Sequence, residues 1–160
     1  MKPVFESDRI RFVRVSEDLV QDYLTMVNDT EHVERFLGGG HEPFTEEQEV
    51  AWVRRTLAEQ APVFSMLEKD SGRFIGNIEL MDVHGGEGEL GIALTAAMQD
   101  RGYGTEAVKA LTAYAPEHLG LERILLRADP GNTRALHVYE KCGFRQTGRT
   151  DTHVCMEFRR

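Results

Sequence analysis

The chain has no long apolar run and no apolar segment at its amino terminus. A membrane-spanning helix needs about 20 consecutive apolar residues, and no stretch of this sequence approaches that length. The opening segment, MKPVFESD, lacks the apolar region of a secretory signal. We therefore expect no membrane association and take the cytoplasm as the compartment.

Cysteine is scarce, since Cys142 and Cys155 are the only two in 160 residues. Two cysteines make no disulfide framework, so we expect free thiols, although a single disulfide between them stays open. His137 and His153 are near these cysteines in sequence, but the spacing matches no zinc motif. We therefore expect no metal.

Basic residues are in the minority, with 19 Lys and Arg against 27 Asp and Glu and a net charge of −8. Binding along a phosphate backbone needs a basic face, so we expect no nucleic-acid partner. An acidic protein attracts cationic substrates such as amines, although an acidic surface also simply keeps a protein in solution.

The remaining composition is that of a globular protein, with 41% hydrophobic and 29% charged residues. The length predicts a single domain over residues 1–160. Hydrophobic patterns and turn residues predict the element order β, α, α, β, β, β, α, β, α, β, β. The predicted strands are residues 10–15, 63–68, 74–81, 89–94, 122–128, 144–149 and 152–158. This order indicates an α/β fold with a mixed, mostly antiparallel sheet of about seven strands.

Local signals mark several boundaries of the predicted helices. Ser16 is placed to cap the first helix, and Thr45 opens a capping box for the second. Pro116 is expected to end or kink the third helix, because proline lacks a backbone donor. A short helical piece at 33–37 precedes a flexible loop, Gly38-Gly39-Gly40.

The most informative segment is Gln99-Asp100-Arg101-Gly102-Tyr103-Gly104-Thr105, which joins a predicted strand to a predicted helix. Its two glycines allow the backbone to approach a ligand closely, and the first amides of the helix form an anion site. The segment lacks the Gly-Lys-Ser/Thr of a P-loop and the third glycine of a dinucleotide fingerprint. It therefore predicts a different kind of phosphate-bearing ligand, with an ordinary helix-capping turn as the alternative.

Two further patterns accompany this junction. The pattern Q-x-x-G-x-G over residues 99–104 is followed by N-x-x-A-x-x-x-Y-E-K-C-G-F over residues 132–144, and the strand FIGNIEL at 74–80 precedes both. In this order and spacing, the three resemble the motifs of the GNAT superfamily of acyl-CoA-dependent N-acetyltransferases. The segment Asp8-Arg9-Ile10-Arg11-Phe12 resembles the corresponding segment in one branch of this superfamily. That branch contains ribosomal-protein N-terminal acetyltransferases and spermidine acetyltransferases.

The resemblance implies a GNAT fold, with helices on both faces of the sheet and the strands at 89–94 and 122–128 splayed apart to hold the cofactor. It also implies transfer of an acetyl group from acetyl-CoA to a primary amine, by direct attack of the amine. The acceptor is a protein N-terminal α-amine or a small-molecule amine. A homodimer is possible, with the C-terminal strands as a plausible edge.

The same resemblance implies an acetyl-CoA site that draws on both motifs. Strand backbone contacts the pantetheine arm, the junction cradles the pyrophosphate, and the last helix contributes side chains. The implied residues are Ile92, Ala93, Leu94, Gln99, Arg101, Gly102, Tyr103, Gly104, Thr105, Asn132, Ala135 and Tyr139. For Asn132 the alternative is a helix N-cap, and for Ala135 an ordinary helix former.

Four residues are candidates for the chemistry. Tyr139 is expected to protonate the departing thiolate, with a packed aromatic as the alternative, and the backbone N–H of Leu94 to stabilise the oxyanion. Glu89 and Glu79 are candidates for the base that takes the amine proton, because each belongs to a strand expected to flank the site. His84 and His137 are weaker candidates, and a solvated surface group is the alternative for each.

Phe36, Phe44 and Trp52 are candidates to line an acceptor pocket, or else they belong to the core. A CoA-binding module without catalysis is the second functional hypothesis, and Tyr139 argues against it. A dinucleotide-binding protein is disfavoured by the missing third glycine.

Overall fold

The computed structural model describes residues 1–29, 31–33 and 42–160. The loop expected at Gly38-Gly39-Gly40, Phe36 and most of the helical piece expected at 33–37 lie outside the described residues.

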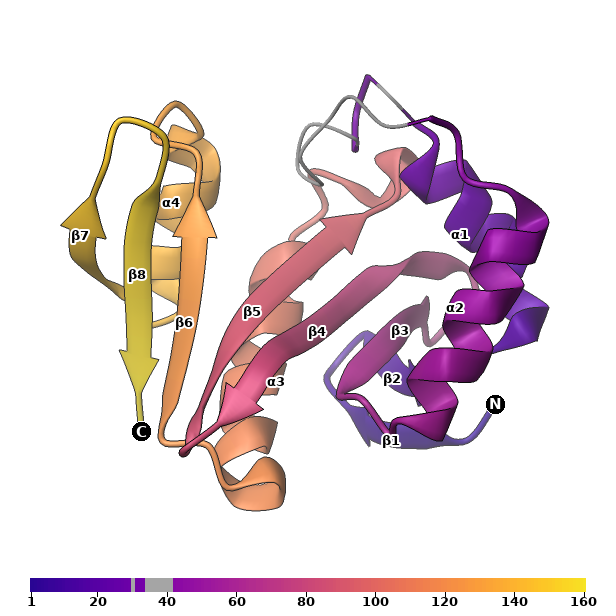
Figure 1. Ribbon diagram of the computed structural model, residues 1–160, viewed down its shortest axis with the longest axis horizontal. Helices are drawn as coiled ribbons and strands as arrows, with labels where there is room; N and C mark the ends of the chain where they lie inside the picture. Colours follow the sequence, from indigo (N-terminus) through magenta and orange to yellow (C-terminus); the bar gives the residue numbers. More distant parts are fainter. Residues whose placement is uncertain (30, 34–41) are drawn as a thin grey trace. The chain divides into compact units, whose positions relative to one another are not determined.

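The described strands form one sheet in the order β1-β2-β3-β4-β5-β6-β8-β7 (Figure 1). These strands are β1 (Pro3–Glu6), β2 (Ile10–Arg14), β3 (Val63–Glu68), β4 (Phe74–His84), β5 (Glu87–Leu94), β6 (Arg123–Ala128), β7 (Arg145–Arg149) and β8 (Val154–Arg159). The helices are α1 (Val20–Val27), α2 (Glu46–Ala58), α3 (Tyr103–Leu119) and α4 (Thr133–Lys141), with short 3-10 turns η1 (Glu17–Leu19) and η3 (Ala96–Met98). The described ladders are antiparallel, except that β5 and β6 run parallel. The expected α/β fold with a mixed, mostly antiparallel sheet is confirmed.

The sheet has eight described strands rather than the seven that the sequence predicted, because β1 was missed. β1 is four residues long and begins at Pro3, so it offers little alternation to recognise. Proline is tolerated at the first position of an edge strand, where its missing N–H costs no ladder bond. Phe5 fixes the strand by stacking on Phe12 of β2, with ring centroids 4.2 Å apart.

Contacts divide the chain into two compact units, and β4 and β5 contribute to both. The first unit comprises Met1–Glu79 and Ile92–Tyr103. Its core gathers buried residues of β2, β3 and the two N-terminal helices, among them Val13, Tyr23, Val53, Val63 and Leu67. Tyr23 meets Trp52 and Phe74 edge-on, with centroids 5.5 Å apart in each case.

A chain of hydrogen bonds crosses this core. The backbone N–H of Ser16 donates to the Tyr23 hydroxyl (3.1 Å), which lies 2.6 Å from the Ser65 hydroxyl. Ser65 in turn donates to the side-chain oxygen of Asn77 (2.8 Å), so Tyr23 is the donor to Ser65. The chain satisfies polar groups that burial would otherwise leave costly, and it fixes Asn77 on β4.

The second unit comprises Leu80–Gly91 and Gly104–Arg160. In it, β6 pairs with β8 over its whole length, and β7 pairs with β8 as the edge strand of the sheet. The parallel ladder between β5 and β6 ends at the pair Glu89 and Leu125. Within this unit both strands continue beyond that last described pair.

Most local boundary signals are confirmed. The Ser16 hydroxyl accepts from the Asp18 N–H at the start of η1, and Thr45 and Gln48 form a complete capping box for α2. Pro116 does not end α3, which continues to Leu119 with this proline inside it. None of the helices in the described part of the chain combines the length and hydrophobicity that crossing a membrane requires.

Gly76 of β4 lies so close to β5 that no side chain fits there. A Cβ at this position would lie 2.0 Å from the carbonyl oxygen of Ala93 and 2.9 Å from the Cα of Leu94. Both neighbours are backbone atoms, which cannot rotate away. The glycine is therefore a steric requirement for the position of residues 93–94.

We predict that Gly76→Ala lowers the free energy of unfolding by about 2 kcal/mol or more, because the strands must separate to admit the methyl group. Chemical denaturation measures the change. Gly148→Ala on β7 is the control, since a methyl group there would have no atom within 4 Å, and we expect a change of less than about 0.5 kcal/mol. Equal stability of Gly76→Ala and the wild type would contradict the steric argument.

Candidate active site

The glycine junction forms a tight turn between β5 and α3. After η3, Asp100 takes a left-handed conformation with φ of 65°, and Gly102 takes φ of 83°. A left-handed backbone suits glycine but costs about 1 kcal/mol for other residues, so the conformation of Asp100 needs support from its surroundings. Helix α3 begins directly after this turn, at Tyr103. The turn therefore presents the first amides of a long helix, as the sequence predicted.

Two residues distant in sequence, Arg9 and Glu68, contact the turn and hold it in place. The Arg9 guanidinium lies over the Tyr103 ring, 4.3 Å from its centroid, and donates to the Arg101 carbonyl oxygen at 3.0 Å. The Tyr103 hydroxyl donates to the Glu68 carboxylate. The hydrogen bond to Glu68 is the main cause that raises the pKa of Tyr103. The side chain of Tyr103 thus anchors the turn to β3.

Gln99 uses its side chain within the protein. Its amide donates to the Leu94 carbonyl oxygen at 3.0 Å and to the His32 carbonyl oxygen at 3.2 Å. The first bond fixes the end of β5, where Ile92 and Leu94 are half-buried and Ala93 is buried. In this structure Gln99 orients the backbone that we expect to contact the cofactor arm.

The second motif forms α4 and its two ends. Asn132 caps the helix, because its side-chain oxygen accepts from the Ala135 N–H at 3.1 Å. The N-cap alternative for Asn132 is therefore observed, and its side-chain NH₂ is not used by that bond. Ala135 lies half-buried in the first turn.

The C-terminal end of α4 explains the spacing from Tyr139 to Gly143 and Phe144. The Gly143 N–H donates to the Glu140 carbonyl, and the Phe144 N–H donates to the Tyr139 carbonyl, each at 3.0 Å. With φ of 94° at Gly143, this is a Schellman motif, which joins the third residue from the helix end to the second residue beyond it. The rings of Tyr139 and Phe144 pack edge-on at 6.0 Å, the apolar contact that accompanies this motif.

Tyr139 has the properties of a proton donor. Burial raises the pKa of its hydroxyl above the ordinary value, so the group keeps its proton at neutral pH. Among the described residues, no hydrogen bond to this hydroxyl is observed. The hydroxyl therefore carries a proton that it can donate in a hydrogen bond to a ligand.

Cys142 connects the two motifs inside the second unit. Its thiol lies 3.7 Å from the Thr105 carbonyl oxygen and donates to it, which joins the end of α4 to the first turn of α3. Burial raises the pKa of this thiol, which keeps it a neutral donor. Gly104 and Thr105 of the first motif thereby lie beside the helical turn that carries Tyr139.

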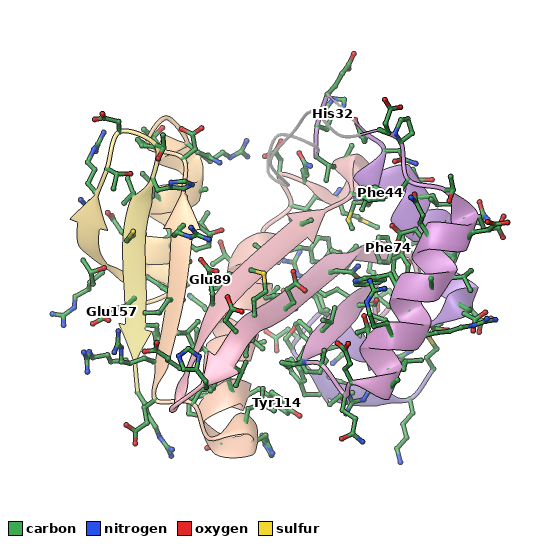
Figure 2. All side chains as sticks on the ribbon, in the orientation of Figure 1. His32, Phe44, Phe74, Glu89, Tyr114 and Glu157 are labelled. Atoms are coloured by element: carbon green, nitrogen blue, oxygen red, sulfur yellow. The ribbon has the colours of Figure 1, made fainter. Side chains whose placement is uncertain are left out.

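The two candidate bases lie in different environments. Glu79 belongs to the first unit and is half-buried on β4, and burial raises its pKa. Glu89 of the second unit lies on β5 (Figure 2). It forms an ion pair with Arg127, with 2.7 Å between the Glu89 Oε1 and the Arg127 Nε. Glu89 lines an open groove of about 240 Å³, together with Asp82, His84 and Glu87. The Arg127 guanidinium occupies the Glu89 oxygen that a base would use.

Other candidates have simpler environments. His84 is exposed and contacts the Asp82 carbonyl, and His137 is exposed on α4. Trp52 is half-buried against the core, and Phe44 is exposed. Among the described residues, no group of three His, Cys, Asp or Glu side chains is placed to hold a metal ion.

Sequence reasoning missed the two contacts that support the motifs from outside. Arg9 is separated from Arg101 by 92 positions, and Cys142 is separated from Thr105 by 37. The segment around Arg9 was noticed only as a likeness to one branch of a family. No local sequence pattern predicts a contact with a residue so far away in the chain.

Known proteins resemble this chain in sequence and in fold. The family model described as acetyltransferase (GNAT) domain matches residues 9–145. The uncharacterized N-acetyltransferase YnaD of Bacillus subtilis is 30% identical over 106 residues, which are 66% of this chain and 62% of that protein. The uncharacterized N-acetyltransferase p20 of Bacillus licheniformis is 30% identical over 95 residues, 58% of this chain and 53% of the relative. The match thus spans less than two thirds of the length of these curated relatives.

Solved structures share the fold over nearly the whole chain. A GNAT-family acetyltransferase from Bacillus anthracis has a TM-score of 0.83 at 21% identity, covering 96% of each chain. The spermidine N-acetyltransferase of Vibrio cholerae, solved with CoA and spermine, has a TM-score of 0.82 at 17% identity, also covering 96% of each. At these identities the likeness concerns the fold. The family model, which matches most of the sequence, identifies the family: this chain belongs to the acetyltransferase (GNAT) domain family.

Proposed function

We propose that this chain is an acetyl-CoA-dependent N-acetyltransferase whose acceptor is a primary amine. The observation that carries the proposal is that both motifs are present in the fold: a left-handed glycine turn opens α3, and a half-buried Tyr139, whose pKa burial raises, lies beside that helix. We further propose that both units act as a single domain over residues 1–160. The family match supports this, because residues 9–145 include segments of both units.

The turn fits the phosphates of acetyl-CoA. Backbone amides at a helix start bind anions without needing side chains, and a left-handed glycine admits close approach. The proposed contacts to the donor are from Gln99, Arg101, Gly102, Tyr103, Gly104, Thr105, Asn132, Ala135 and Tyr139, with the backbone of Ile92, Ala93 and Leu94 along the arm. Acetyl-CoA supplies an activated thioester, and the protein residues position it.

Each protein group then has one task. The amine nitrogen forms a bond to the acetyl carbonyl carbon while the carbon–sulfur bond breaks. Glu79 accepts the proton that the amine loses, Tyr139 donates its proton to the departing sulfur, and the Leu94 N–H donates to the carbonyl oxygen. Exchange with water restores both side chains.

We assign the base to Glu79 rather than to Glu89, the other carboxylate that the sequence offered. A base must accept a proton near neutral pH, and burial raises the pKa of Glu79 toward that range. Glu89 is held by Arg127.

The proposal also covers the cellular compartment, the oligomeric state and the range of acceptor amines. Both cysteines are free thiols, which supports a reducing compartment, and we propose the cytoplasm. The edge position of β7 supports a homodimer through the C-terminal strands. Polyamines, peptide N-termini and other amines are all acceptors that this chemistry allows.

Thiol release from acetyl-CoA tests the proposed function. We expect release that depends on an added amine, in a panel of polyamines, amino acids and short peptides, and an acetylated amine in the products by mass spectrometry. Tight acetyl-CoA binding without release for any amine would favour the CoA-binding module. Neither binding nor release would contradict the proposal.

Tyr139→Phe should lower kcat about 100-fold, because the departing sulfur loses its proton donor. The KM for acetyl-CoA should stay within about twofold, because the ring and its contact with Phe144 remain. Tyr114→Phe on α3 is the matched control, since that ring stacks on His118 away from the motif (Figure 2). Steady-state kinetics at saturating amine measures both variants, and undiminished turnover in Tyr139→Phe would refute the acid assignment.

Gly104→Glu should abolish the thermal stabilisation by acetyl-CoA, because a carboxylate would enter the proposed phosphate site. For the wild type, ligand at about 100 times its Kd should raise the Tm by about 5 °C or more. Gly148→Glu is the control, because β7 has open space at that position. A shift that persists in Gly104→Glu would show that the turn is not the phosphate site.

Glu79→Gln should lower kcat/KM about 100-fold and remove the acid limb of its pH profile. Glu79 acts only when ionised, so activity in the wild type falls as the pH falls through its pKa. Because burial raises that pKa, the limb should lie above the ordinary glutamate value of about 4.3. Rate measurements across pH on Glu79→Gln and Glu89→Gln separate the candidates, and loss of the limb only in Glu89→Gln would move the base to Glu89.

A further inference from the structure

The turn before α3 is held by two residues of the β2–β3 region, Arg9 and Glu68, which contact Arg101 and Tyr103. Arg9 precedes β2, and its backbone carbonyl accepts from the Lys69 N–H at 2.8 Å, so its position is fixed by the end of β3. Glu68, the last residue of β3, pairs in register with Ile10. Anchored in this way, Arg9 contacts Tyr103 and Arg101, and Glu68 contacts Tyr103. We call Arg9, Glu68 and Tyr103 the turn clamp.

The hydrogen bond from Arg9 fixes the direction of one peptide group. In a planar trans peptide, the C=O and the N–H of the next residue point in opposite directions. Arg9 Nη1 binds the carbonyl oxygen of Arg101 at 3.0 Å, so the N–H of Gly102 is directed away from Arg9. The same bond keeps a partial negative charge from facing the side where an anion would bind.

The ring of Tyr103 fixes the next residue. One face of the ring is covered by the Arg9 guanidinium, and the hydroxyl is bound to Glu68. Glu68 is itself oriented by the Ser71 hydroxyl at 2.6 Å, and the hydrogen bonds from Ser71 and Tyr103 lower the pKa of Glu68. The ionised carboxylate is the stronger acceptor for the tyrosine. Both ends of the Tyr103 side chain are therefore held.

The residue before the clamped segment, Asp100, has a left-handed backbone. A non-glycine residue in that region persists only where the surroundings determine the conformation. At Gly102, a Cβ would lie 3.3 Å from the Arg9 Nη2, so a side chain there would displace the guanidinium. The glycine thus serves the clamp as well as the turn.

We propose that Arg9 is a positioning residue for the binding of acetyl-CoA. Its hydrogen bond directs the Arg101 carbonyl away from the phosphate site, so the turn amides are oriented toward the phosphates before the ligand binds. The inference rests on the proposed function, since it assumes that the turn is the phosphate site. Arg9 acts on the backbone through the Arg101 carbonyl and the Tyr103 ring. It takes no part in proton transfer, so its effect is on binding of the donor alone.

Arg9→Gln tests this directly. We expect the Kd and KM for acetyl-CoA to rise about tenfold, the loss of one charge-assisted hydrogen bond, with kcat within about twofold of the wild type. Arg9→Lys keeps the charge over the ring and should recover part of the affinity. Arg11→Gln is the matched control, an exposed arginine on the neighbouring strand β2, and should bind acetyl-CoA as the wild type does. Titration calorimetry and kinetics on the intact chain measure these effects.

The outcomes separate the inference from the proposed function. If Arg9→Gln binds acetyl-CoA normally while Gly104→Glu does not, the clamp is wrong and the phosphate site stands. If both bind normally, the proposed site itself is wrong. A fall in kcat at unchanged KM would also overturn the positioning role. If Arg9→Gln does not fold, Tyr103→Phe and Glu68→Gln disturb the clamp from its other end, and an unchanged KM in both would refute it.

Discussion

Binding an anion with backbone amides imposes one constraint on the chain between β5 and α3: the N–H groups must face the ligand and the carbonyls must face elsewhere. Left-handed residues at Asp100 and Gly102 reverse the chain within a few residues, and α3 then begins at Tyr103. Such a turn does not hold its shape by itself, because Asp100 is strained and the peptide planes can rotate. Arg9 and Glu68 supply the restraint from the neighbouring strands.

Tyr139 depends on a comparable restraint at the other motif. The Schellman motif fixes its backbone carbonyl through the Phe144 N–H, and the Phe144 ring packs on its side chain. Cys142 joins this helix end to the Thr105 carbonyl. The spacing that the sequence displays as a motif is therefore the spacing of a helix terminus, and the catalytic hypothesis uses a tyrosine that this terminus holds in place.

Local sequence signals predicted what local physics controls. The Asn132 cap and the capping box at Thr45 each depend on hydrogen bonds that span a few residues. The order of elements and the mixed sheet followed from alternation and turn residues. Strand β1 was not predicted because it is short. Helix α3 continues beyond Pro116 because a proline near a helix end removes few hydrogen bonds.

Contacts between residues that are distant in the chain could not be predicted from the sequence. The ion pair of Glu89 with Arg127 spans 38 positions, and it is one reason why we propose Glu79 as the base. The Gln99 side-chain amide donates to the Leu94 and His32 carbonyl oxygens, and the sequence predicted neither bond. No periodicity or motif encodes these partners, because they depend on how strands are ordered in the sheet.

The most direct test of the proposed donor site is an amide chemical-shift titration of isotopically labelled protein with CoA. We predict that the largest changes occur at the amides of residues 101–105, with Tyr139 and its neighbours also perturbed. Changes centred on the groove of Asp82, Glu87 and Arg127, with the turn amides unmoved, would contradict the assignment of the turn as the phosphate site.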